Sequence, residues 1–526
     1  MASSTQTMVA APSLRNAHGP EDGIPLTSLV GAANSTPEND PPPPRGSHLQ
    51  KALITFQLSG VNLTSSMING LITVGLPTIA ADLDLAPSLA LWPASVSGLA
   101  TATTLLLAGS IADVLGSRGV ELLGCFANGA VMLGQGASRT GAELVGLRAI
   151  QGVALALHLA ASVGVITEHV PEGRGRNIAF SCLGLSQVLG FSVGLVLGGI
   201  FVDTIGWRAG WYLSGGATLL LGVLGLWVLP RGRDGRKIGH VVRQIATTVD
   251  WVGAGLASAF MALLSYLLAV VSTDISRIRH TDSIVILCLS LIVLPSFVFW
   301  VHRQVRLGRP ALIPNSLWKN TAFSSICITV ALSSAVLNSL ELFASLFFQD
   351  VQRLPALQAS IRILPSMLIG VVLNVTTGFF VDRVPAFWLV TVSSLLCAGS
   401  PLLMAVIKPE STYWANGFVA QLLQPTSFDV LFTVGLIVVS NSFDDNNKSL
   451  AGAVFNAAAQ FGSALGLGIM QVVSTLVTKQ SGAEGIRAIM EGFRASFWTM
   501  FAFMILCAVL GGFGLGKTGK VGLKRD

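Results

Sequence analysis

The sequence predicts an all-α integral membrane protein whose fourteen transmembrane helices form two repeated halves. Hydrophobic residues make up 52% of the chain and charged residues only 11%, whereas roughly a quarter of the residues in an ordinary soluble domain are charged. So little charge cannot cover the surface of a soluble protein. The charged residues also collect at intervals, and the segments between them are long enough to cross the ~30 Å hydrocarbon core of a bilayer.

Fourteen uncharged segments define the predicted helices. We expect the ninth helix to extend past Glu341 and the twelfth to continue past Asp429, beside a kink at Pro425. The segments are 52–81, 85–112, 122–138, 149–167, 177–202, 209–230, 251–273, 283–302, 320–340, 363–381, 384–407, 411–428, 449–478 and 495–516.

The basic residues predict the orientation of these helices. An even number of spans places both termini on one side, and a cytoplasmic amino terminus puts 21 Lys and Arg on that side, ten on the other and Arg148 inside a span. Positive charge is retained in the cytoplasm, so both termini are expected there. The net charge of +6 then reflects contact with an anionic leaflet, and a nucleic-acid partner is not expected.

The first fifty residues and the cysteines carry no sign of a catalytic or metal site. Residues 1–50 are rich in Pro, Ser, Asn and Gly, which predicts a disordered cytoplasmic tail, and they lack the pattern of a signal peptide. The six cysteines lie singly inside apolar segments without metal-ligand spacing. We therefore expect no metal and no disulfide framework.

Two similar motifs lie at equivalent places in the two halves. An aspartate at the edge of a helix can meet the positive amino-terminal end of a neighbouring helix, which would act as a latch on one conformation. The alternative is a tight turn with a polar residue at the water boundary, which a second copy makes less favourable. Repeated halves in a membrane are typical of transporters. The motif residues are Gly109, Asp113, Gly116 and Arg118 after the second helix, and Gly378, Asp382 and Arg383 after the tenth.

The fourth predicted helix carries a polar stripe formed by Arg148, Gln151, His158 and Ser162. These residues fall within an arc of roughly 80° at 100° per residue. A charge inside the membrane costs about 3 kcal/mol on insertion scales unless it faces a cavity or a partner, so Arg148 is expected to point inward. His158 is the one histidine of seven in the interior of a span, since His302 is the last residue of the eighth segment, and this position suits a proton switch. A neutral histidine that donates to a carbonyl is the alternative.

Two acids inside predicted helices are candidates for proton coupling. Glu341 and Asp429 are costly in lipid and are therefore functional-site candidates, unless they lie in water at the outer interface. We expect His158 and one of these acids to carry the proton, while the charge of Arg148 influences their protonation. The residues expected to face a substrate cavity are Gln151, Ser162, Gln187, Asn338, Asn456 and Gln460.

Glycine-rich faces predict close helix packing. Small residues let two helix backbones approach each other in the membrane. Their matching positions in the two halves suggest the seam along which the halves move, although packing alone is the simpler interpretation. These residues are Gly152, Gly190, Gly194, Gly198 and Gly199 in the first half, and Gly462 and Gly466 in the second.

Taken together, these motifs resemble the major facilitator superfamily over residues 51–516. The fourteen spans and the Asp250-Trp251 start of the seventh helix are similar to its fourteen-span drug:proton antiporter branch, and Tyr413-Trp414 resembles fungal members. The resemblance implies alternating access around a central cavity. It also implies a six-helix bundle over 51–230, an inserted helix pair with cytoplasmic loops over 231–320, a second bundle over 321–516 and a basic cytoplasmic tail over 517–526.

Three positions depart from the pattern of that family. Val114 replaces the usual basic residue of the first latch motif, and Leu195 replaces the usual proline of the antiporter glycine motif. Ile68 stands where the family has an acid in its first helix. Any proton coupling therefore cannot run through a carboxylate of the first helix.

The expected function is proton-coupled antiport that exports small, largely apolar organic compounds, with the proton gradient as energy source and no cofactor. The expected location is the plasma membrane, with the vacuolar membrane as the alternative, and the expected partners are lipid, a small-molecule substrate and protons, for a monomeric chain. A dedicated carrier for a metabolite, a siderophore or a small inorganic acid is the runner-up, and a non-transporting sensor is a weaker alternative. No enzyme motif occurs in the sequence.

Overall fold

The computed structural model describes residues 48–85, 91–170, 174–230, 249–273, 278–309, 311–313, 315–380, 383–443 and 445–516. Within these ranges the long regular elements are all helices, with no long strand. Thirteen of the described helical segments are long and apolar enough to cross a membrane. The all-α membrane fold that the sequence predicts is thus confirmed. The predicted side of the two termini stays a prediction.

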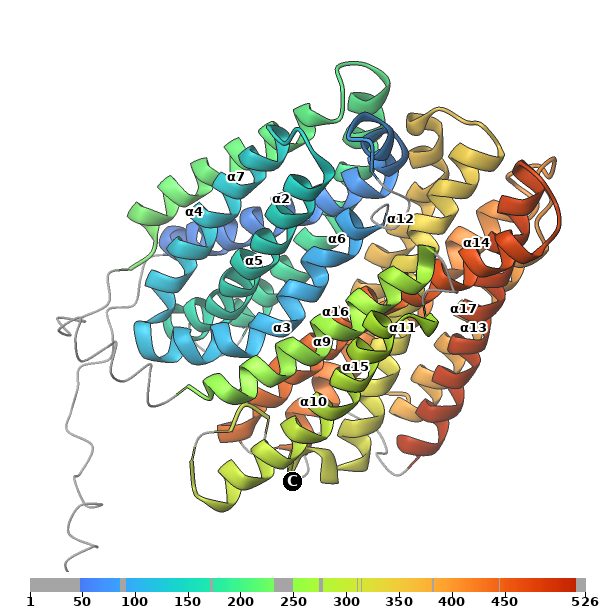
Figure 1. Ribbon diagram of the computed structural model, residues 1–526. Helices are drawn as coiled ribbons and strands as arrows, with labels where there is room; N and C mark the ends of the chain where they lie inside the picture. The colour runs from blue at the N-terminus through green and yellow to red at the C-terminus, as the bar shows by residue number, and fades with distance from the viewer. Residues whose placement is uncertain are drawn as a thin grey trace, which may run out of the picture. The chain divides into compact units, whose positions relative to one another are not determined.

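Six helices form the first half (Figure 1). They are α2 (His48–Asp82), α3 (Trp92–Leu115), α4 (Ser117–Gly136), α5 (Gly141–His169), α6 (Arg174–Asp203) and α7 (Arg208–Val228). α4 does not reach the apolar threshold of a spanning helix, because polar residues such as Glu121, Asn128 and Gln135 interrupt its sequence. All three of these side chains are fully buried.

Two further helices lead to the second half. The inserted helices α9 (Trp251–Thr273) and α10 (Thr281–Arg306) contact each other, and α9 also packs on α3 and α16. The second half contains α11 (Thr321–Leu346), α12 (Ala356–Phe380), α13 (Ala386–Val406), α14 (Gly417–Leu423), α15 (Thr426–Ser442), α16 (Asp445–Gln480) and α17 (Ile486–Gly514). The predicted twelfth span is α14 and α15 together, and it is interrupted at Pro425, which has no N–H to continue the helix.

Asp250 joins the inserted pair together. Its carboxylate accepts hydrogen bonds from the N–H of Gly253 at 2.8 Å and from the indole of Trp300 at 2.9 Å. A third bond comes from the N–H of Leu312 at 3.2 Å. The side chain therefore caps the start of α9 and ties it to α10 and to the segment that follows.

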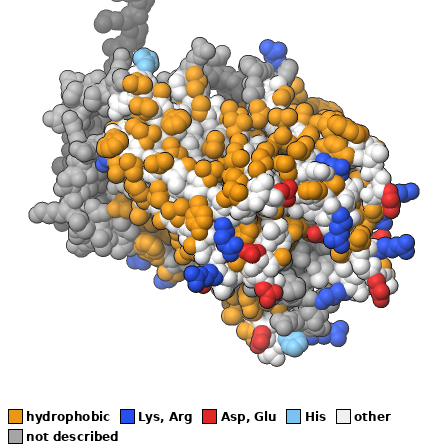
Figure 2. All heavy atoms as spheres, turned by 90° about the horizontal axis from the view of Figure 1, so that it is seen from above, with side chains coloured by type: hydrophobic (Ala, Val, Ile, Leu, Met, Phe, Trp, Pro, Cys, Tyr) orange, Lys and Arg blue, Asp and Glu red, His pale blue; other side chains and the backbone are white. Residues whose placement is uncertain are grey.

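The surface of the bundle is apolar. Figure 2 shows hydrophobic side chains over much of one face, with most of the visible Lys, Arg, Asp and Glu over its lower middle and right part. Leu220, Trp227 and Phe299 lie on helices and are 73%, 80% and 69% exposed. Such a continuous apolar surface needs a lipid environment.

Most of the predicted packing glycines contact helices of their own half, whereas the sequence predicted them along the seam between the halves. A Cβ atom at Gly194 of α6 would overlap the backbone of Met67 on α2, and one at Gly462 of α16 would overlap the backbone of Ala331 on α11. Both contacts join helices of the same half. Gly190 and Gly198 likewise face α2, Gly466 faces α11 and Gly152 of α5 faces α3, whereas Gly199 meets Leu357 of α12 in the other half.

Candidate functional site

A small cavity lies between the two halves. Its volume is about 60 Å³, enough for a few water molecules and well below the roughly 300 Å³ of the smallest usual ligand pockets. The cavity must therefore widen before an organic molecule can occupy it. It is lined by Asn69, Ile72, Thr73, Ala94, Ser95, Gly98, Arg148 and Phe191 of the first half, and by Asn338, Glu341, Leu342, Gln460, Ser463, Ala464 and Leu467 of the second.

Arg148 projects into this cavity from α5 and is held by three hydrogen bonds. Its guanidinium donates to the carbonyl oxygen of Pro93 at 2.9 Å, to Oε1 of Gln151 at 2.7 Å and to Oδ1 of Asn69 at 2.9 Å. These partners belong to α3, α5 and α2. Arg148 is only 1% exposed, and within the described residues no carboxylate lies within ion-pair distance of it. The cation is thus fixed in position by neutral groups.

Two further side chains, Gln135 and Trp211, hold Gln151 in place through hydrogen bonds. The amide of Gln135 on α4 donates to Oε1 of Gln151 at 3.0 Å. The indole of Trp211 on α7 donates in turn to Oε1 of Gln135 at 2.6 Å. Gln151, a predicted cavity residue, therefore stands behind Arg148 and orients it, and does not itself line the cavity.

Glu341 enters the cavity from the second half. It lies on α11 and is 5% exposed, so the alternative position in open water at the interface does not describe it. Across the described part of the chain, its carboxyl makes no hydrogen bond or ion pair. Asn338, one turn earlier, donates to Ser334 of its own helix at 3.1 Å. Arg148 and Glu341 thus bring a cation and an ionisable carboxyl to the same cavity, one from each half.

Asp429 lies apart from the cavity, in the interior of the second half. It is 8% exposed on α15 and accepts a hydrogen bond from Nδ2 of Asn374 on α12 at 2.9 Å. Among the other predicted cavity residues, Gln460 lines the cavity, as does Asn338. Ser162, Gln187 and Asn456 do not line it. Gln187 lies on the surface of α6, and Asn456 donates to Gly452 of its own helix at 2.9 Å.

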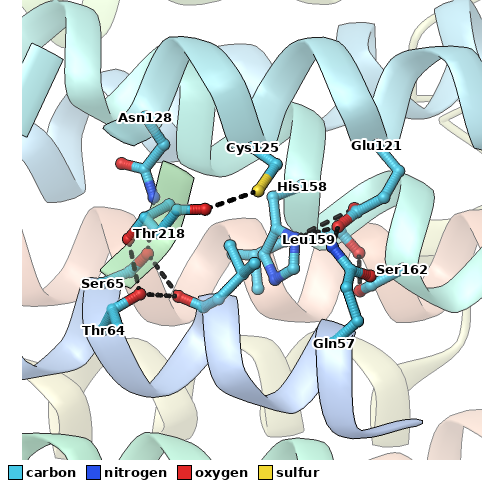
Figure 3. A network of polar contacts seen from close by, with 11 residues as sticks. Gln57, Thr64, Ser65, Glu121, Cys125, Asn128, His158, Leu159, Ser162 and Thr218 are labelled. Atoms are coloured by element: carbon cyan, nitrogen blue, oxygen red, sulfur yellow. Dashed lines mark hydrogen bonds and ion pairs between the residues drawn. The ribbon is translucent and has the colours of Figure 1, made fainter. Parts of the chain in front are cut away.

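His158 is paired with an acid that the sequence analysis missed. Its Nδ1 lies 2.9 Å from both carboxylate oxygens of Glu121 on α4, and both side chains are fully buried (Figure 3). The expectation that His158 and either Glu341 or Asp429 carry the proton stays a prediction, and no hydrogen bond joins His158 to either acid among the described residues. The amide of Gln57 on α2 also donates to Oε1 of Glu121 at 3.3 Å. The second ring nitrogen of His158, Nε2, is buried and has no hydrogen-bond partner among the described residues.

Glu121 escaped the sequence analysis because it directly precedes the third uncharged segment. An acid at that position looks like the water boundary of a span, but α4 begins four residues earlier, at Ser117. A usable signal was present: Glu121, Asn128 and Gln135 recur every seven residues and so share one helix face. A polar face on a membrane helix indicates a buried polar network.

The first latch motif forms the junction between α3 and α4. Gly116 separates the two helices with φ of 87°, a conformation that favours glycine. Arg118 donates to the carbonyl oxygens of Leu229 and Leu226 at 3.0 Å each, and so caps the carboxyl end of α7. The side chain of Asp113 lies outside the described residues, and a Cβ at Gly109 would meet nothing within 4 Å.

The second latch motif is described only in part. Gly378 falls within α12 and Arg383 is exposed in a turn before α13, whereas Asp382 lies outside the described residues. The latch role of both motifs stays a prediction.

Two hydrogen bonds tie the halves together at one end of the bundle. The carboxylate of Asp203 at the end of α6 accepts from the N–H of Leu357 at the start of α12, at 3.0 Å. The amide of Gln349, just after α11, donates to the carbonyl oxygen of Val74 on α2 at 3.0 Å. On the predicted topology this closed end faces away from the cytoplasm.

Comparisons with known proteins support a single family. The model of the Major Facilitator Superfamily matches residues 58–423. The chain is 39% identical to "MFS-type transporter 1" of Pyricularia oryzae over 93% of this chain and 89% of that protein. It is 24% identical to the "Low affinity ammonium transporter" of Saccharomyces cerevisiae over 77% of each. Other relatives, 25 to 26% identical, are named for antibiotic resistance or export.

A solved structure is similar in fold. The crystal structure of a bacterial homologue of the human lysosomal transporter Spinster, in an inward-facing and unoccupied conformation, superposes with a TM-score of 0.63 at 15% identity. The match covers 91% of this chain and all of that one.

Proposed function

Because the chain belongs to the Major Facilitator Superfamily and is a multi-pass membrane transporter, we propose that it is a proton-coupled antiporter that exports small organic compounds. The proposal places it in the fourteen-span drug:proton antiporter branch of fungal type, in the plasma membrane, with the proton gradient as its energy source. The observation that carries the proposal is Glu341, whose carboxyl lies in a cavity between the two halves and has no hydrogen-bond partner in the part of the chain that the structure describes.

A carboxyl in such a cavity can exchange a proton as the cavity opens and closes. Protonated Glu341 is neutral and can remain buried in the narrow cavity, where a carboxylate without a hydrogen-bond partner would be unfavourable. A substrate must widen the cavity to enter, and water that enters with it, together with the Arg148 cation, stabilises the carboxylate, so that Glu341 releases its proton. Proton binding and substrate binding at one cavity then exclude each other, which is the requirement for antiport.

The rest of the lining favours neutral or hydrophobic substrates. Ile72, Phe191, Leu342 and Leu467 give the cavity an apolar wall between its few polar groups. Such a wall recognises shape and releases water from apolar surface more than it forms ion pairs. Export as the direction is supported by the relatives named for antibiotic resistance or export.

A dedicated carrier for a small ion is the second candidate. Two observations favour it: the cavity holds only about 60 Å³, and one relative is named a low affinity ammonium transporter. In that case Glu341 would bind the cation itself. The two candidates differ in whether the cavity must widen during transport.

Transport in reconstituted vesicles with an imposed proton gradient tests both candidates. The antiporter should move puromycin against the direction of proton flow and lose this gradient dependence in Glu341→Gln, whereas methylammonium should move in neither protein. Methylammonium transport without puromycin transport would replace the proposal with the small-ion carrier. Puromycin transport that ignores the proton gradient would contradict proton coupling.

A further inference from the structure

The pair of Glu121 and His158 forms a second ionisable centre, inside the first half. Neither residue lines the cavity between the halves. His158 is ten residues beyond Arg148 on α5, which corresponds to about 15 Å along the helix axis. The pair lies among α2, α4 and α5, and Figure 3 shows the imidazole of His158 directed at the carboxylate of Glu121 beside Gln57. It is therefore a site of its own.

This pair is electrically neutral when it holds a single proton. The proton can reside on the imidazole next to a carboxylate, or on the carboxylic acid next to a neutral imidazole. Removal of the proton leaves a buried carboxylate with only the ring N–H and the Gln57 amide as donors, and addition of a second leaves a buried imidazolium beside a neutral acid. Both states bury a net charge, which is unfavourable until water reaches the site.

The surroundings provide little other charge to balance the pair. On α4, Cys125 stands one turn beyond Glu121 and its thiol donates to the carbonyl oxygen of Thr218 at 3.4 Å. Arg118, one turn before Glu121, is occupied with the carboxyl end of α7. The remaining charged groups of α2, α6 and α7 stand at the helix ends, at His48, Lys51, Asp82, Arg174, Arg176, Asp203 and Arg208.

The packing indicates which helix must move to admit water. A Cβ at Gly124 would lie 2.9 Å from the backbone nitrogen of His158, so α4 and α5 are in close contact at the pair. α2 approaches it through the longer 3.3 Å bond of Gln57. His158 Nε2, buried and without a partner, offers a position that a water molecule can reach when α2 separates.

We propose that Glu121 and His158 together form a proton-binding site that takes up and releases one proton as α2 moves against α4 and α5. The released proton passes to the entering water, and reprotonation restores the neutral pair. This inference rests on the proposed proton coupling and adds a second site to it. The two sites communicate through α5, which carries both His158 and Arg148, and through α2, which carries both Gln57 and Asn69.

The test is a pH-difference infrared spectrum of the full-length protein in lipid, recorded between about pH 5 and 8. We expect a protonated carboxyl signal that is lost in Glu121→Gln, and that is also lost or shifted in His158→Gln because the proton is shared. His280→Gln is the matched control. His280 is exposed, so its substitution should remove a histidine signal and leave the carboxyl signal unchanged. The exchange variant, Glu121→His with His158→Glu, should restore the carboxyl signal and keeps the test valid if the single variants do not fold.

The spectra need neither substrate nor gradient, so they separate this inference from the proposed function. A Glu121→Gln spectrum that retains every carboxyl signal of the wild type overturns the site, as does a Glu121 signal that His158→Gln leaves unchanged; a signal of Glu341 is expected to remain in both variants. If the signals behave as expected while vesicles show no proton-driven export, the antiport proposal fails and the proton site remains. Proton-driven puromycin export that keeps the wild-type pH profile in the exchange variant and in Glu121→Gln would remove the pair from the transport cycle.

Discussion

The two halves share their packing but differ in how they hold the group that each brings to the cavity. In the first half, the guanidinium of Arg148 donates hydrogen bonds to Pro93, Gln151 and Asn69. In the second half, the carboxyl of Glu341 makes no hydrogen bond or ion pair within the described residues. The first half therefore holds its cavity group in a fixed position, whereas the second half presents a carboxyl whose protonation can change.

Pairs of aromatic side chains are more frequent in the described part of the second half than in that of the first. Phe343 meets Phe493 at 5.5 Å between ring centroids, and Phe347 meets Phe348 at 5.5 Å. Contacts of this kind stabilise without fixing hydrogen-bond geometry. The two halves are therefore similar in how their helices pack, but they differ in the polar and aromatic side chains that fill them.

The shared packing predicts the largest effects, and these should be equal in the two halves. Gly194→Ala and Gly462→Ala each place a Cβ into the backbone of the facing helix, so each should lower the free energy of unfolding by about 3 kcal/mol. Gly184→Ala on α6 and Gly452→Ala on α16 are matched controls, because a Cβ at either position meets nothing within 4 Å. Denaturant unfolding in detergent measures all four, and equal losses in variants and controls would contradict the packing argument.

The two ionisable groups of the cavity should respond unequally to substitution. Arg148→Gln leaves oxygen acceptors of Pro93, Gln151 and Asn69 without their donor, so we expect a loss of about 2 kcal/mol in unfolding free energy. Glu341→Gln replaces a buried carboxyl that makes no hydrogen bond or ion pair within the described residues, and it should leave stability unchanged or raise it by up to about 1 kcal/mol. Thermal unfolding in detergent decides the matter. Equal destabilisation by both substitutions would mean that Glu341 has a partner after all.

Asp429 should show a smaller, pairwise effect. A double-mutant cycle of Asp429→Ala and Asn374→Ala should give a coupling energy of about 1 kcal/mol, as expected for one hydrogen bond. The cycle of Glu341→Ala and Asn338→Ala serves as the matched comparison, and its coupling should be near zero, since Asn338 bonds its own helix. A coupling of similar size in both cycles would remove the distinction between these two acids.

The sequence was sufficient for the fold and for the cation in the cavity, but not for the pairing of the charges. Long uncharged segments predict membrane-spanning helices directly. A single cation in such a segment, Arg148, is unfavourable in lipid and is therefore expected to face a cavity. Which acid lies next to His158 depends on the rotation of α4 about its own axis. The residues around His158 on α5 do not indicate that rotation; only the polar repeat on α4 does. The break at Pro425 followed from a local rule, whereas the isolation of Glu341 is a property of the tertiary structure.

The smallest effect concerns the pH response of the second half at its surface, outside the spanning helices. Burial raises the pKa of Tyr413 to about 12, while its hydroxyl donates to the carbonyl oxygen of Arg362 at 2.8 Å. Because the folded pKa lies above the unfolded one, this phenol contributes stability below about pH 10 and loses it as the pH rises toward 12. Spectrophotometric titration of the three tyrosines should show a late step that disappears in Tyr413→Phe and persists in Tyr212→Phe. If that late step persisted in Tyr413→Phe, the phenol would have to be exposed to water in the folded protein.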